Sequence, residues 1–282
     1  MTLRKSILWT LFWVVAALMV NIVIYFYLGS EKAMQFLAGY VIEKSLSVDN
    51  LFVFLIIFSY FKLSVVQQRC ALNYGIIGVI ILRGIMIYTG IALIEHFEWI
   101  LYLFGAFLVY SGIKLTYSKD IEVNPENHFV MRSLNRIFPI KEDHGGTKFF
   151  IKEDNKWFIT SMFIVLVVIE TTDVVFAVDS IPAVFGITTN PFIVFSSNLL
   201  AVLGLRSIYF VLEKVQSVFV YVKYGVGLVL FFVGMKMLTA NIYEVGTLIS
   251  LCVVLGILSL SVILSVVKNS MQLAKNKVSE IS

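Results

Sequence analysis

Long apolar runs separated by short polar segments dominate the chain. Eight runs are long enough to cross the roughly 30 Å hydrocarbon core of a bilayer as α-helices. They cover residues 7–28, 33–61, 72–94, 99–117, 157–184, 191–212, 218–238 and 247–267. The pattern predicts an all-α, polytopic transmembrane bundle of about eight helices, which forms a single membrane domain over residues 1–282. The one long polar segment, 118–156, is interpreted as a cytoplasmic linker.

Acidic residues interrupt two of these apolar runs. An ionised group at the centre of a membrane helix costs about 3 kcal/mol or more, so such acids usually face a protein interior and carry function. Interhelical hydrogen bonding is the structural alternative, and three acids within one run favour a functional site over it. The acids of the second and fifth runs are Glu43, Asp49, Glu170, Asp173 and Asp179.

The two acidic runs belong to an internal duplication. Aligning Val-Asp-Asn at 48–50 with Val-Asp-Ser at 178–180 preserves the spacing of the acids, and an arginine and a lysine recur further along. The paired positions are Glu43 and Asp173, Asp49 and Asp179, Asn50 and Ser180, Arg83 and Arg206, and Lys114 and Lys236.

Each copy of the repeat, 33–117 and 157–238, contains three predicted helices. Because three is an odd number, the two copies enter the membrane from opposite sides. This predicts the inverted-repeat architecture of secondary transporters, whose binding sites lie near the bilayer midplane where the repeats meet. The runs 7–28 and 247–267 are extra helices outside the repeat.

The acids of one run cannot all share one helical face. Six residues correspond to about 600° of helix rotation, so Glu43 and Asp49 point about 120° apart. Either the helix opens locally or the two acids face different neighbours. Pro182, three residues after Asp179, favours an opened backbone in the second acidic helix. Lys44 either neutralises an acid or lies at an interface, and the sequence supports both equally.

The charge of the chain follows membrane topology. Hydrophobic residues make up 59% of the chain and charged residues 14%, with a net charge of +4. Lys and Arg concentrate in the segments that are internal if the N-terminus is cytoplasmic, which predicts that both termini are cytoplasmic, in a plasma (inner) membrane. No nucleic-acid partner, enzymatic activity, catalytic residue or resident cofactor is predicted. The two cysteines are expected to be free thiols, and the oligomeric state is left open.

The predicted site is rich in negative charge. Five acids with Arg83 and Arg206 as counter-ions leave three uncompensated negative charges, which a divalent cation and a proton nearly balance. Coupled titration of such acids lets metal and proton exchange at one site. The available ligands are oxygen atoms, since no His or Cys lies in the repeat core. Oxygen ligands favour manganese, magnesium or calcium over zinc or copper.

Three stretches of the chain resemble the signatures of TerC-type integral membrane proteins. They read E-K-S-L-S-V-D-N-L-F-V-F from Glu43, E-T-T-D-V-V-F-A-V-D-S-I-P-A-V-F from Glu170, and N-P-F-I-V-F-S-S-N-L-L-A-V-L-G-L-R-S-I-Y-F from Asn190. Lys44 departs from the pattern, in which a small residue is commoner.

The resemblance covers nearly the whole chain. It implies a member of the LysE-like transporter superfamily, associated with tellurium resistance and manganese efflux, and hence an exporter for which proton antiport is expected. The metal-site positions that it implies are Glu43, Asp49, Asn50, Glu170, Asp173, Asp179 and Ser180.

Three other functions are weighed against manganese export. An intramembrane protease would use Asp49 and Asp179, but the Gly-x-Gly-Asp context of such enzymes is absent. A non-transporting scaffold in a metal or tellurite stress complex would dock partners on 118–156 and leaves the buried acids unexplained. A transporter of calcium, magnesium or sodium uses the same acids, whereas an oxyanion fits poorly with a negatively charged site.

Overall fold

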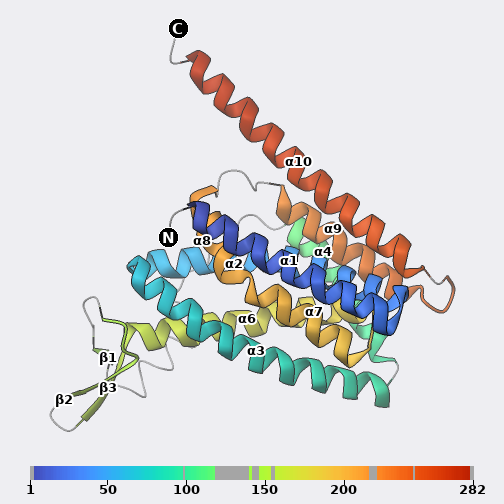
Figure 1. The fold of residues 1–282 in the computed structure, drawn as a ribbon, viewed down its shortest axis with the longest axis horizontal. Coiled ribbons are helices and arrows are strands. Elements are labelled where there is room, and N and C mark those ends of the chain that lie inside the picture. The colour runs from blue at the N-terminus through green and yellow to red at the C-terminus, as the bar shows by residue number, and fades with distance from the viewer. Residues whose placement is uncertain are drawn as a thin grey trace.

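A bundle of helices forms most of the molecule. The computed structural model describes residues 3–97, 99–117, 140–141, 146–153, 156–215, 221–243 and 245–279. Its helices run roughly along the long axis of the molecule, and α10 leans away from the others toward its C-terminal end (Figure 1). The helices are α1 (Leu3–Leu28), α2 (Ser30–Tyr60), α3 (Val65–His96), α4 (Ile100–Tyr117), α6 (Ser161–Phe185), α7 (Pro191–Leu203), α8 (Leu205–Val215), α9 (Val222–Leu238) and α10 (Thr247–Ser279).

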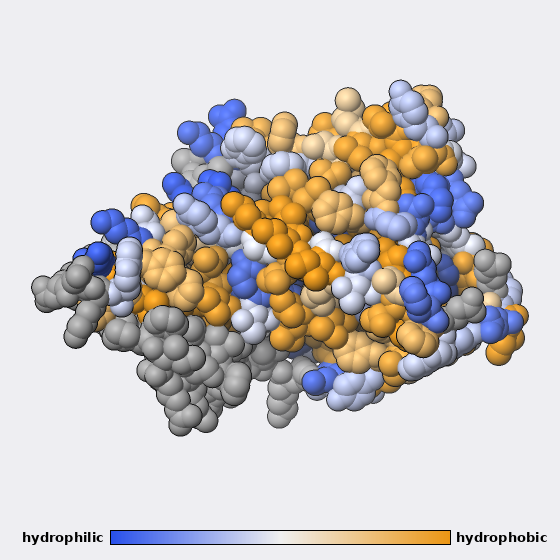
Figure 2. Space-filling view, turned by 90° about the horizontal axis from the view of Figure 1, so that it is seen from below, coloured by the Kyte–Doolittle hydropathy of each residue, from blue (hydrophilic) through white to orange (hydrophobic). Residues whose placement is uncertain are grey.

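The helices are built for a bilayer. Among the described residues, six helical stretches are long and apolar enough to span one, so the predicted all-α membrane bundle is confirmed. Large apolar side chains of α3 point outward at helical spacing, and Ile77, Ile81 and Ile85 are each more than half exposed. Apolar side chains cover most of the middle of the face shown in Figure 2, and hydrophilic ones gather toward its two ends. Such a surface suits contact with lipid.

A small sheet lies at one end of the bundle (Figure 1). Its strands are β1 (Ile140–Lys141), β2 (Phe150–Glu153) and β3 (Lys156–Thr160), in the order β1-β3-β2, with β2 antiparallel and β1 parallel to β3. Thr160 ends the sheet and begins α6, because its hydroxyl accepts a hydrogen bond from the Phe163 amide. The rest of the predicted linker, 118–139 above all, lies outside the described residues.

One expected element boundary is wrong. Residues 157–160 form strand β3 rather than the first turn of a helix, since the Lys156–Thr160 segment pairs with β2 through backbone hydrogen bonds. The run 191–212 forms one candidate membrane span, as predicted, and Gly204 interrupts it between α7 and α8.

The backbone of the second acidic helix is not opened, so that prediction is also wrong. α6 remains helical past Pro182 to Phe185. Proline removes one backbone donor, but the next turn bonds again, since the Gly186 amide donates to the Pro182 carbonyl at 3.0 Å. α2 is equally continuous through Glu43 and Asp49.

α4 and α9 pack through glycines at close backbone distance. A Cβ atom placed on Gly105 would lie 3.1 Å from the Gly234 carbonyl oxygen, and one on Gly234 would lie 2.7 Å from the Gly105 carbonyl oxygen. Gly112 and Gly227 meet in the same reciprocal way, at 2.5 and 2.9 Å. Residue numbers rise along α4 where they fall along α9, so the two helices are antiparallel.

The four glycines are related by the internal duplication. The offset of 122 residues that pairs Lys114 with Lys236 also pairs Gly105 with Gly227 and Gly112 with Gly234. Exchanging the two repeats therefore turns one glycine contact into the other. The packing of α2 on α7 and of α3 on α6 is related by the same exchange. The inverted relation of the repeats stays a prediction, and antiparallel, reciprocal packing of equivalent helices is what it requires.

The glycine contacts between α4 and α9, here called the glycine seam, are close enough that one added methyl group should lower the stability of the protein. We expect Gly112→Ala to destabilise the protein by about 1–3 kcal/mol, because the new Cβ meets rigid backbone rather than a movable side chain. The thermal unfolding midpoint in detergent measures the effect. Gly256→Ala on α10 is the matched control, since nothing lies within 4 Å of that site, and it should not lower the midpoint. Equal midpoints for both variants would contradict the glycine seam.

Candidate functional site

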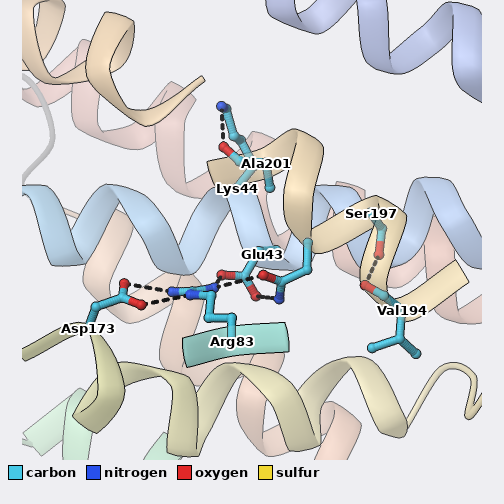
Figure 3. Close-up of polar contacts among 8 residues, drawn as sticks. Glu43, Lys44, Arg83, Asp173, Val194, Ser197 and Ala201 are labelled. Carbon is cyan, nitrogen blue, oxygen red and sulfur yellow. Dashed lines mark hydrogen bonds and ion pairs between the residues drawn. The ribbon is translucent and has the colours of Figure 1, made fainter. Parts of the chain in front are cut away.

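A buried ion-pair cluster centred on Arg83 lies inside the bundle (Figure 3). The Arg83 side chain is only 2% exposed, and its guanidinium donates to both carboxylate oxygens of Asp173, at 2.8 and 2.9 Å. It also donates to the carboxylate of Glu43, which is fully buried. Two acids therefore share one arginine, and with both acids ionised the cluster keeps one uncompensated negative charge.

A neutral amide completes the cluster. The side-chain oxygen of Asn198 accepts from Arg83 at 3.3 Å, and its side-chain nitrogen donates to Glu43 at 3.0 Å. The four side chains come from α2, α3, α6 and α7, and those of α2, α3 and α6 lie near the middle of long helices. The cluster therefore joins both copies of the predicted repeat near the middle of the bundle.

The remaining acids of α6 have other neighbours. Glu170 lies against α3 beside Gly78, where an added Cβ would collide with its carboxylate, and its Oε2 atom is buried without a hydrogen-bond partner among the described residues. Asp179 accepts a hydrogen bond from Ser111 of α4 at 2.8 Å. Of the three acids on this helix, one meets Arg83 and the other two face separate parts of the bundle.

α2 carries a buried polar stripe that includes two of its predicted ligands, Glu43 and Asn50, together with Ser47. Glu43, Ser47 and Asn50 are all less than 4% exposed, and the Ser47 hydroxyl has no hydrogen-bond partner within the described part of the chain. Ser180, the counterpart of Asn50 on α6, is equally buried and its hydroxyl is also without a partner there. The side chain of Asp49 lies outside the described residues.

Among the described residues, Arg206 forms no ion pair with the predicted acids, so its role as a counter-ion stays a prediction. Its guanidinium donates to the Asn73 side chain of α3 at 2.5 Å and lines a cavity with two tryptophans of α1. The reason is packing, because α1 lies outside the repeat and contacts α8, so the environment of Arg206 has no counterpart around Arg83.

Lys44 lies at an interface, one of the two interpretations left open by the sequence. It points away from Glu43, and its ammonium donates to the Ala201 carbonyl at 2.9 Å (Figure 3). That carbonyl belongs to the last turn of α7, where a cation complements the helix dipole. A side chain on Gly204 would collide with the ammonium, so the break between α7 and α8 admits Lys44.

The described acids among the predicted metal ligands lie in separate parts of the bundle. Within the described residues, no three His, Cys, Asp or Glu side chains come together as a metal-binding group. The cavity beside Arg83 and Asn198 measures about 10 Å³, barely the space of one water molecule. The guanidinium of Arg83 thus stands where a cation would otherwise meet Glu43 and Asp173.

Sequence reasoning missed two residues of the site. Asn198 bridges Arg83 and Glu43, and Ser111 binds Asp179. Neutral side chains cost much less to bury than charges, so they give a weaker pattern. The polar triplet Ser196-Ser197-Asn198 inside an apolar run is the feature that could have found Asn198.

Removing the charge of Arg83 should destabilise the protein, because Glu43 and Asp173 then lack a counter-charge. We expect Arg83→Gln to destabilise the protein by about 3–5 kcal/mol, because it leaves two carboxylates buried without a counter-charge. The thermal unfolding midpoint in detergent measures the loss. Adding Glu43→Gln and Asp173→Asn to the same variant should restore most of it, since no buried charge then remains unpaired.

Glu95→Gln is the control for this series, since Glu95 is exposed at the end of α3 and should leave the midpoint unchanged. An unchanged midpoint for Arg83→Gln would show that the cluster does not hold the four helices together.

The chain is similar to known membrane proteins over most of its length. The family described as "Integral membrane protein TerC family" matches residues 28–273. A protein of Escherichia coli K12 named "Putative membrane-bound redox modulator Alx" is 42% identical, over 94% of this chain and 85% of its own. The "Uncharacterized membrane protein STKORF319" of Myxococcus xanthus is 40% identical, over 94% and 83%. No solved structure matches. The buried acids of α2 and α6 fall within the matched residues, and the chain belongs to the TerC family of integral membrane proteins.

Proposed function

We propose that the protein is a secondary transporter that exports a divalent metal cation in exchange for protons, with manganese as the leading candidate for the cargo. The observation that carries the proposal is the buried cluster in which Glu43 and Asp173, from the two halves of the chain, share Arg83. Buried charges are costly, so two acids held at this depth favour a role in moving charge across the membrane.

The proposed binding step is a competition between two cations. Arg83 occupies both carboxylates, so a metal ion binds only after at least one acid leaves the guanidinium. The hydroxyl oxygens of Ser47 and Ser180 and the Oε2 atom of Glu170 are buried and without partners among the described residues, which makes them candidates to complete the ligand set. A set of carboxylate and hydroxyl oxygens suits manganese, magnesium or calcium.

Proton exchange follows from the same carboxylates. A protonated acid neither binds a divalent cation well nor needs Arg83, so protons entering from one side promote release of the metal to that side. Export in this sense requires protons to move inward. We propose that the protein lies in an inner membrane with both termini on the cytoplasmic side, because Lys and Arg concentrate in the segments that are internal in that orientation.

The names of several relatives suggest a redox role as an alternative. The cysteines of this chain do not support a dithiol redox site. The chain contains two cysteines, both free, with Cys70 on α3 and Cys252 on α10. Neither belongs to a Cys-x-x-Cys pair, the arrangement typical of dithiol oxidoreductases.

Metal movement in proteoliposomes tests the proposal. Vesicles that contain a manganese-sensitive dye and the purified protein should show Mn²⁺ movement that depends on an imposed pH gradient. Glu43→Gln and Asp173→Asn should each slow it at least about tenfold, because each removes a buried charge from the proposed site. Thermal unfolding confirms that each variant is folded.

The control and the competing functions are resolved in the same assay. Glu95→Gln removes an exposed carboxylate of α3 and should transport at the wild-type rate. Movement of calcium or magnesium without manganese would change the cargo and keep the transporter. No ion movement above empty vesicles with folded protein would overturn the proposal and favour the scaffold.

A further inference from the structure

A second polar cavity lies away from the acids, between α1, α3 and α8. Its volume is about 380 Å³. α1 and α3 each pack on α8 and form its walls. Its lining combines aromatic and apolar side chains with one cation and one amide, namely Trp9, Trp13, Asn73, Ile76, Leu203, Arg206 and Ser207.

Two arginines follow the contact between α3 and α8, with Arg206 in the lining of the cavity and Arg69 outside it. Arg206 binds Asn73, and one turn away Arg69 lies over the ring of Phe210, with 5.6 Å from its guanidinium carbon to the ring centre. Arg69 and Asn73 are four residues apart on α3, as are Arg206 and Phe210 on α8, so these two interactions stack along that contact.

Within the described part of the chain, neither guanidinium has an acidic partner. No carboxylate oxygen there lies within the 4.0 Å ion-pair distance of either arginine, and the Nε atom of Arg69 is buried without a hydrogen-bond partner among the same residues. The ammonium of Lys44 lies beside Gly204, and a Cβ atom placed on Gly204 would be 3.4 Å from Trp13, so a third cation adjoins the cavity. Among the described residues, the charged groups beside the cavity are therefore cations.

The cavity lies toward the end of α3 that contacts the polar segment before β2, which is the end expected nearer the lipid headgroups. α3 has 32 residues, about 48 Å at 1.5 Å per residue, which exceeds the roughly 30 Å hydrocarbon core. Arg69 and Asn73 fall in its first nine residues. Gln67 of the same turns donates to the Gly146 carbonyl in the polar segment before β2, which fixes this end of α3 outside the hydrocarbon.

The aromatic wall has the composition of a membrane interface. Trp9 and Trp13 are four residues apart and face the cavity from α1, and Trp9 is half exposed, so the cavity opens at the surface of the bundle. Tryptophan is enriched at the headgroup level of membranes. The exposed Arg4 and Lys5 precede Trp9 by about one turn and attract anionic lipid to the same end.

We propose that this cavity binds an anionic phospholipid, with the headgroup phosphate on Arg206, the Arg69 guanidinium one turn away adding positive charge, and the acyl chains along α1. Guanidinium groups bind phosphate through parallel N–H donors, and Asn73 holds Arg206 in place for it. The apolar lining beside Ile76 and Leu203 suits an acyl chain rather than a free ion. A zwitterionic headgroup would place its own cation near three positive side chains.

Lipid-dependent stability of the purified chain tests this site, without reference to transport. In neutral detergent, phosphatidylglycerol should raise the thermal unfolding midpoint more than phosphatidylcholine with the same acyl chains. In the double variant Arg69→Gln and Arg206→Gln, phosphatidylglycerol should bind about 25-fold more weakly, at about fivefold for each arginine lost. Lys148→Gln, at an exposed residue near β2 at the same end of the molecule, should bind it as the wild type does.

Each other outcome overturns the lipid site. Equal stabilisation by the two lipids, or an undiminished effect in the double variant, contradicts it. An equal rise with inorganic phosphate would assign the cavity to a free anion. If the double variant does not fold, native mass spectrometry of the wild type with equimolar lipids decides, because equal retention of both lipids also contradicts the proposal.

Discussion

A guanidinium inside a membrane bundle cannot be left without partners, and this constraint fixes the centre of the molecule. Arg83 is held by Asp173, Glu43 and Asn198, which come from three other helices. Each contact is strong only because the others remove water and fill the remaining donors. α2, α3, α6 and α7 are therefore held in one relative position as long as both acids are ionised.

The glycine seam supplies the complementary part of the architecture. α4 and α9 touch backbone to backbone at two reciprocal points, and backbone contacts of this kind leave little freedom to slide. In the proposed mechanism the polar contacts around Arg83 exchange one cation for another, whereas the glycine contacts between α4 and α9 cannot rearrange without separating the helices. The proposed transport cycle thus has a rigid pair of helices beside four helices whose contacts depend on charge.

The sequence predicted the charged members of the site better than their partners. Charges inside apolar runs identified Glu43, Asp173 and Arg83, because burial of a charge demands a reason. Asn198 was missed, since an amide disturbs an apolar run far less. The error at residues 157–160 has a similar source, because a short apolar segment fits a strand and a buried helix equally. Pairing with β2, a tertiary contact, decides for the strand.

Arg206 shows where repeat symmetry stops being a guide. It occupies the position equivalent to Arg83, yet one arginine is 2% exposed among carboxylates and the other faces tryptophans and an amide. The duplication gives both positions an arginine, but α1 has no counterpart in the other repeat and packs only beside Arg206. Transport by inverted repeats works through two halves that adopt different conformations in turn. In the proposed cycle the two arginines mark that difference, with the half around Arg83 closed over its acids and the half around Arg206 facing the lipid.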